Sequence, residues 1–127
     1  MKKLAWGAFV AILAAGCAKR IPGTEIADNS DTRGVIETIE RYRNAAEKRD
    51  ASGVLSLVSE TYFDDAGTPD PNDDMDFEQL KKALPDDYKK LVAVRLDLTI
   101  KKINVEGESA TADLFFDNHY RMNTKKG

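Results

Sequence analysis

The chain has a single cysteine and a single histidine among its 127 residues, and this scarcity excludes several kinds of site. One cysteine cannot form an intrachain disulfide framework. The clustered cysteine and histidine spacings that bind zinc are missing. The sequence also has no Gly-x-Ser-x-Gly elbow for a nucleophilic serine and no glycine-rich loop that would cradle phosphate. Catalysis and binding of these kinds have no support in the sequence.

The chain also has no excess of positive charge. The chain has 19 basic and 22 acidic residues, so its formal net charge is −3. Residues 1–16 carry Lys2 and Lys3 and no acidic residue, so without them 17 basic residues stand against 22 acidic ones, a net charge near −5. Such a surface does not attract nucleic acid. It does not attract an anionic leaflet either, so any membrane attachment must come from lipid or from apolar surface.

A hydrophobic run of about 20 residues, long enough to span a membrane, is also missing. The apolar stretch from Leu4 to Gly16 follows the basic start Met1-Lys2-Lys3 and has the length of a signal-peptide core. It ends in Leu13-Ala14-Ala15-Gly16-Cys17, which resembles the lipobox of bacterial lipoproteins. Ala14 stands where such motifs prefer leucine.

The lipobox resemblance implies that Cys17 is acylated and becomes the mature N-terminus. Each buried CH₂ group contributes about 0.8 kcal/mol, so several acyl chains would anchor the protein in effect permanently. Ala18, in place of Asp, implies sorting to the outer membrane, facing the periplasm. The alternative is an ordinary cleaved signal in which Cys17 has no role. We therefore expect a signal peptide over residues 1–16, a lipidated Cys17 with a flexible tether over 17–30, and one domain over 31–127.

The domain begins with apolar residues at helical spacing, which predicts a first helix with its N-cap at Asp31 or Thr32. The residues of this stripe are Val35, Ile36, Ile39, Tyr42, Ala45 and Ala46. Asp50 predicts the N-cap of a short second helix. After an acidic loop, a third helix fits residues 76–84, and Pro85 is expected to disturb it before one more turn.

From Val92 the apolar period changes to two, which predicts a long strand to Val105 with a β-bulge at Lys101-Lys102. Glu106-Gly107-Glu108 predicts a hairpin turn, and residues 109–122 predict the return strand. One face of that strand is expected to face the core: Ala110, Ala112, Leu114, Phe116, Tyr120 and Met122. Tyr42, Tyr62 and Tyr88 are candidates to line a pocket, or plain core residues.

This order of elements, with the phrase Glu47-Lys48-Arg49-Asp50-Ala51-Ser52-Gly53-Val54-Leu55 between the first two helices, resembles the NTF2-like (SnoaL-like) α+β cone. The resemblance covers Asp31 to Met122 and implies helices packed into the concave side of a curved antiparallel sheet. The family includes isomerases, hydrolases, dehydratases and non-catalytic binding or assembly modules, so it does not fix the activity. No catalytic residue of the family can be matched to a residue here.

The sheet of such a cone normally has further strands after this hairpin, whereas the sequence given ends at residue 127. We therefore expect an incomplete, truncated sequence or a minimal sheet with an open edge. An open edge invites pairing with another chain, which makes a homo-oligomer a further expectation.

The acidic loop is a candidate calcium site, because clustered carboxylate and amide oxygens suit Ca²⁺. The spacing of Asp70, Asn72 and Asp74 resembles the start of an EF-hand loop. Met75 replaces the turn glycine, and Lys81 stands where the bidentate glutamate belongs. A solvated loop that ends in an N-cap at Asp76 explains the same residues.

His119, Asp113 and Asp117 share one face of the return strand and are candidates for an acid–base pair. Arg95, Asp97, Lys101 and Arg121 belong to the same face, which favours a surface ladder of cross-strand ion pairs instead.

Three functional hypotheses follow. The first is an envelope lipoprotein whose non-catalytic domain binds an envelope protein or a small ligand. The second is a SnoaL-like enzyme with a buried carboxylate in its pocket. The third is a calcium-dependent binding module.

Overall fold

The computed structural model describes residues 18–124, so the predicted signal peptide and Cys17 lie outside the described residues. The helices are α1 (Ser30–Glu47), α2 (Ala51–Leu55), the 3₁₀ helix η1 (Pro71–Asp73) and α3 (Phe77–Lys89). The strands are β1 (Phe63–Asp64), β2 (Met75–Asp76), β3 (Leu91–Glu106) and β4 (Ser109–Met122). The predicted α+β class is confirmed. Within residues 18–124, no helix has the length and apolar character needed to cross a membrane.

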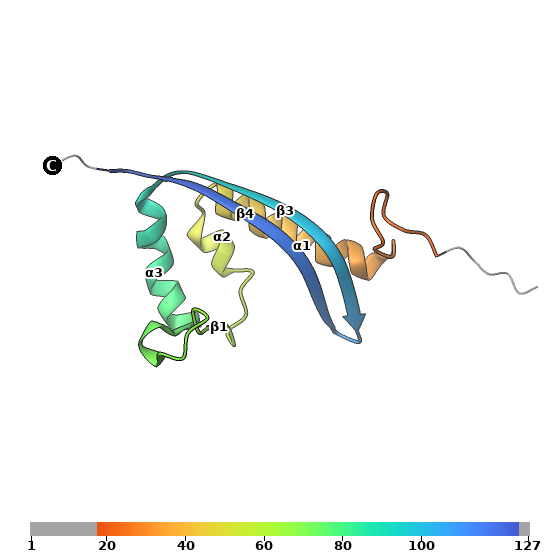
Figure 1. Cartoon of the computed structure of the whole chain (residues 1–127), viewed down its shortest axis with the longest axis horizontal. Coiled ribbons are helices and arrows are strands. Elements are labelled where there is room, and N and C mark those ends of the chain that lie inside the picture. The colour runs from red at the N-terminus through yellow and green to blue at the C-terminus, as the bar shows by residue number, and fades with distance from the viewer. Residues whose placement is uncertain (1–17, 125–127) are drawn as a thin grey trace, which may run out of the picture.

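The long strands β3 and β4 form an antiparallel hairpin that bends over the helices (Figure 1). The ladder shifts between Ile100 and Lys102, which confirms the predicted β-bulge. A second shift, between Leu91 and Ala93, was not predicted. The alternation that begins at Val92 placed this residue on the inner, apolar face of the strand. The second shift turns Val92 away from that face and leaves it 41% exposed. Both extra residues are in β3, so β3 supplies the local bends.

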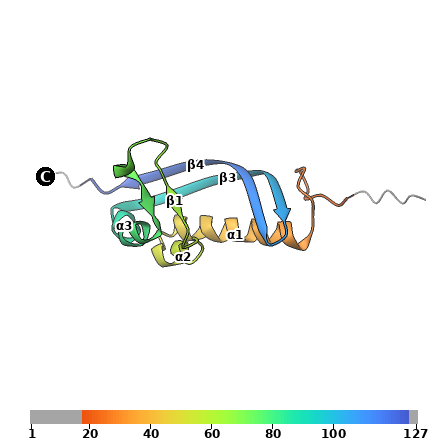
Figure 2. The ribbon, with the colours of Figure 1, turned by 90° about the horizontal axis from the view of Figure 1, so that it is seen from below.

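The helices cover only part of the concave face of this hairpin. Seen from below, α1 runs along the β3 side of the sheet, and α2 and α3 gather at one end (Figure 2). The buried cluster is small: Ala46, Val54 and Leu96, with Leu84, Tyr88 and Leu98 partly buried around it. Because α1 packs against β3, the concave side of β4 is left largely uncovered.

The helix starts agree with the sequence prediction in two of three cases. Asp50 caps α2 by accepting from the Gly53 N–H, and Asp76 caps α3 by accepting from the Gln79 N–H. The prediction for α1 was wrong, since its N-cap is Asn29. The Asn29 side chain accepts from the Thr32 N–H, and the Thr32 hydroxyl accepts in return from the Asn29 N–H.

Two segments differ from their predictions. Helix α3 continues through Pro85 to Lys89, although proline removes one backbone hydrogen bond. The segment predicted as a flexible tether folds back before α1: Arg20 bridges Ala27, and Ile26 is only 4% exposed. Arg33 at the start of α1 donates to both oxygens of Asp28 and lowers the pKa of that carboxyl. Local apolar burial and this ion pair give the end of the predicted tether a defined turn.

Candidate functional site: an apolar groove beneath the sheet

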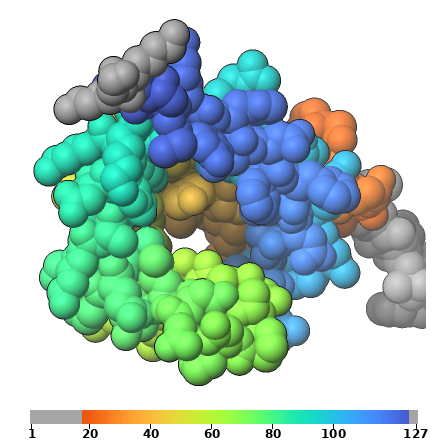
Figure 3. All heavy atoms as spheres, turned by 60° about the vertical axis from the view of Figure 1, so that its left-hand side comes forward, coloured from red at the N-terminus to blue at the C-terminus, as the bar shows by residue number. Residues whose placement is uncertain are grey.

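The concave side of the hairpin is hollowed into a groove of about 440 Å³, lined from α1, the segment after α2, α3, β3 and β4. In Figure 3 the hollow opens between α3, the segment around β1 and β2, and β4, with α1 visible at its base. The lining is mostly aliphatic and aromatic, and its larger members are Tyr42, Leu57, Tyr88, Leu98, Phe116 and Tyr120. The volume is within the range of about 300–1,000 Å³ that is typical of small-molecule sites.

The sequence builds this groove through two periodicities. Alternation along β4 turns Leu114, Phe116 and Tyr120 to the concave face, while helical spacing in α1 turns Ile39 and Tyr42 toward the sheet. The sheet arches over the helices, and because β4 is only partly covered, space is left between the two layers. The groove is therefore the part of the predicted core that the helices do not fill.

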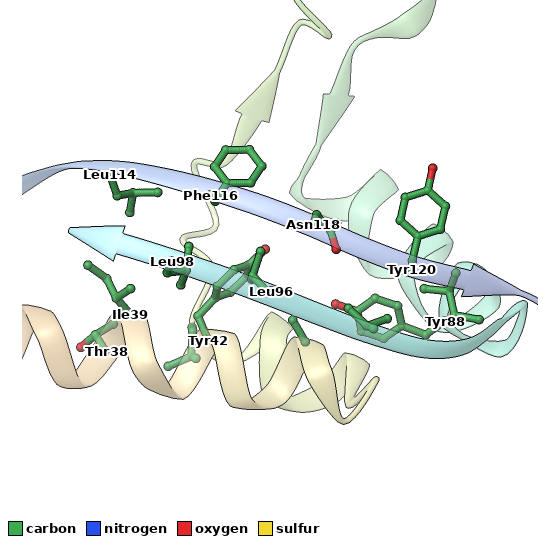
Figure 4. Close-up of a pocket in the computed structure, with 14 residues that line it drawn as sticks. Thr38, Ile39, Tyr42, Tyr88, Leu96, Leu98, Leu114, Phe116, Asn118 and Tyr120 are labelled. Carbon is green, nitrogen blue, oxygen red and sulfur yellow. The ribbon is translucent and has the colours of Figure 1, made fainter. Parts of the chain in front are cut away.

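The two sides of the groove differ in burial. On the α1 side, Leu96 is 5% exposed and closes the floor. On the β4 side, Phe116 and Tyr120 are 64% and 61% exposed, and their rings extend from β4 on the side away from α1 (Figure 4). These two rings form a solvent-exposed apolar wall that a bound molecule or partner would remove from water.

The groove has no formal charge, since none of its lining residues is acidic, basic or histidine. Its polar groups are the tyrosine hydroxyls, Thr38 and the amide of Asn118. Burial raises the pKa of Tyr88, and the nearby Tyr42 and Asp50 raise it further. Tyr88 therefore stays a neutral hydrogen-bonding group at physiological pH. The enzyme hypothesis needs a buried carboxylate here, and the described lining residues do not include one.

The tyrosines suggested by the sequence separate into two groups. Tyr42 and Tyr88 line the groove, whereas Tyr62 does not. Burial and the neighbouring Asp64 raise the pKa of Tyr62. Phe116, Asn118 and Tyr120 were not recognised as site residues, because alternation alone predicts only that they face inward. The signal that would have marked them is the mismatch between a long apolar strand face and the few helical residues available to cover it.

The candidate calcium residues serve the loop backbone. Asp70 caps η1, accepting from both the N–H and the side-chain amide of Asn72. Asp73, rather than Asp74, accepts from the Thr68 hydroxyl, at 2.7 Å. Within residues 18–124, no group of three or more acidic, histidine or cysteine side chains converges as a metal site would require. Calcium binding at Asp70, Asn72 and Asp74 stays a prediction.

His119 lies on the convex face of the sheet, opposite Arg95 in the strand register. Its Nε2 is 3.9 Å from Asp97, whose carboxylate accepts from Arg95 at 2.8 Å. The acid–base candidates Asp113 and Asp117 form no ion pair with His119. The convex face is therefore a partial ion-pair ladder centred on Asp97, separated from the groove by the sheet itself.

Comparison with known proteins adds no assignment: no family model, no curated protein and no solved structure matches this chain.

Proposed function

We propose that this protein is a lipid-anchored lipoprotein of the bacterial envelope whose domain is a non-catalytic binding module, with the concave groove as its binding site. The observation that carries the binding proposal is the groove itself, an uncharged apolar hollow whose wall at Phe116 and Tyr120 is more than half exposed. Exposed apolar surface gathered in a concavity is typical of ligand and partner sites.

The lining defines the chemistry of what binds. A charged ligand would lose its hydration without gaining a countercharge, which disfavours its binding. An uncharged ligand with apolar or aromatic surface would bury Phe116, Tyr120 and Leu98 while hydrogen bonding to Tyr88 or Asn118. A small molecule of this kind, or an apolar segment of an envelope protein, fits the site.

The NTF2-like form of the module is part of the proposal. Its support is the arrangement of three helices on the concave side of a bent antiparallel hairpin, in the chain order expected for that cone. The anchor rests on the lipobox resemblance at Leu13 to Cys17. Ala18 favours the outer membrane, with the domain in the periplasm.

The binding proposal is tested by native mass spectrometry of residues 18–127, secreted into a periplasm without the lipid. We expect an uncharged small-molecule adduct, or binding of the uncharged solvatochromic dye Nile red when it is added. A chain that carries no adduct and does not bind the dye would contradict a binding groove.

The anchor is tested separately. The full chain is expected to sediment with membranes and to take up labelled fatty acid, and Cys17→Ser is expected to do neither. If Cys17→Ser still takes up the label and stays in the membrane fraction, the lipoprotein proposal is wrong, whatever the groove binds.

A further inference from the structure

The two outer edges of the β3–β4 hairpin differ in whether side chains from the rest of the chain bond to their backbone groups. On the β3 edge, the Leu96 N–H donates to Glu47 Oε2 at 3.2 Å. On the same strand, the Arg49 guanidinium donates to the carbonyls of Leu91 and Val92 at 2.8 and 2.7 Å. Side chains that satisfy edge groups in this way block pairing with another strand. The β3 edge is therefore protected at both of these points.

The β4 edge has no comparable protection among residues 18–124. β4 contains no proline and no lysine, and both register shifts place the extra residue in β3. Prolines, bulges and charged side chains, lysine above all, are the usual devices that keep an edge strand from pairing, and of these β4 has only Asp113, Asp117 and Arg121. Within residues 18–124, β4 is thus a long, regular strand whose outer edge pairs with no other strand.

The hydrogen bond of Leu96 also fixes which β4 groups point outward. Because the Leu96 N–H points to Glu47, away from β4, Leu96 and the opposing Asn118 form a non-hydrogen-bonded pair. The N–H and C=O of Asn118 therefore point to the free edge, and those of Phe116 and Tyr120 do so by alternation. The Asn123 N–H points the other way and donates to Lys90 O at 2.9 Å, as the alternation requires.

The convex face of β4 carries charges that its own sheet does not neutralise. Asp117 lies opposite Asp97, a second carboxylate. Asp97 has Arg95 and His119 as partners, whereas neither Asp117 nor Arg121 forms an ion pair within residues 18–124. A cation placed beside the open edge near Asp117 would offset the repulsion between the two carboxylates.

We propose that β4 pairs antiparallel with β4 of a second copy of this chain, with Asn118 on the two-fold axis. The outward backbone groups of Asn118 then face the same groups of the second copy, as a hydrogen-bonded pair requires. Asp117 faces His119 of the second copy. Its two diagonal neighbours in the second copy are Arg121, whose long side chain can reach it, and Asp117, whose short side chain stays farther away. The symmetry repeats both contacts.

The concave side fits the same register. Phe116 faces Tyr120 of the second copy, and Leu114 faces Met122, so apolar residues lie opposite apolar ones on both sides of the central Asn118 pair. A register centred on Asp117 would instead set that carboxylate opposite itself. Pairing through Asn118 joins the two hairpins into one sheet and adds the second copy's Phe116 and Tyr120 beside the open wall of the groove. The pairing does not depend on what the groove binds.

The test is a charge-reversal complementation with full chains carrying two different tags, co-expressed and extracted in mild detergent. One tag is purified and the amount of the second is measured. We expect wild-type copies to co-purify, and Asp117→Arg paired with itself, or Arg121→Asp paired with itself, to lose about tenfold of that signal. Asp117→Arg paired with Arg121→Asp restores opposite charges at both contacts and is expected to recover it.

The matched control is Glu108→Arg, a charge reversal in the exposed hairpin turn outside the pairing segment, which is expected to co-purify like wild type. Asn118→Pro removes an outward N–H without removing a hydrogen bond to β3, and is expected to reduce co-purification as well. If the reversed pair does not recover, or if the self-paired variants co-purify like wild type, the second copy is not held through β4.

Discussion

Replacing Phe116 with alanine is expected to weaken binding in the groove about tenfold and to leave the free energy of unfolding nearly unchanged. Complete burial of a phenylalanine side chain contributes about 2–3 kcal/mol. Since the Phe116 side chain is 64% exposed, about two thirds of that gain is still available to a ligand, or roughly 1.5 kcal/mol. A loss of about 1.4 kcal/mol in binding free energy corresponds to a tenfold larger dissociation constant. The folded protein loses little, since substitutions at exposed positions typically change stability by about 0.5 kcal/mol or less.

The neighbouring Phe115 provides the matched control. It is 70% exposed on the opposite, convex face, where Lys101 lies 5.3 Å from its ring. Nile red is titrated into residues 18–127 of wild type, Phe116→Ala and Phe115→Ala, and urea unfolding is measured for each. Only Phe116→Ala should bind more weakly. Equal affinities in all three proteins, or a loss confined to Phe115→Ala, would refute the assignment of the groove.

Leu96→Ala should lower the free energy of unfolding by about 3 kcal/mol in urea titrations, because it empties the centre of a small buried cluster; a loss below about 1 kcal/mol would show that the cluster is not the core. Because the pKa of Tyr88 is raised in the folded protein, the contribution of its neutral hydroxyl to stability is complete below pH 10.0, the ordinary pKa of tyrosine. This contribution is lost as the pH rises through the folded-state pKa, because the unfolded chain ionises first. Tyr88→Phe should therefore lose less stability than wild type in alkaline buffer, and identical alkaline profiles would contradict the burial of its hydroxyl. The calcium hypothesis for Asp70, Asn72 and Asp74 predicts a higher melting temperature in millimolar calcium, and an unchanged value rejects it.

Local pattern was sufficient for much of the fold. Strict alternation predicted both long strands, and the phase slip at Lys101-Lys102 predicted the main bulge, because a period of two cannot absorb an extra residue. The caps at Asp50 and Asp76 followed from side chains that accept from backbone N–H groups. The start of α1 was misplaced because Thr32, expected as a candidate cap, is the third residue of the helix and completes a capping box with Asn29.

The site was harder to predict because it depends on contacts between distant segments. Phe116 has the sequence pattern of a core residue, and the structure leaves it exposed because α1 packs under β3 and does not reach across β4. The second shift, between Leu91 and Ala93, also escaped the alternation pattern. Sequence periodicity predicts which face is apolar, whereas the packing of the helices decides how much of that face is covered.

If the groove binds an apolar molecule, a bound dye must lie against its lining. Nuclear Overhauser contacts between Nile red and residues 18–127 report where the dye lies. We expect contacts from the dye to Leu98, Phe116 and Tyr120. Contacts confined to the convex face around Phe115, or a bound dye with no contact to these groove residues, would contradict binding in the groove.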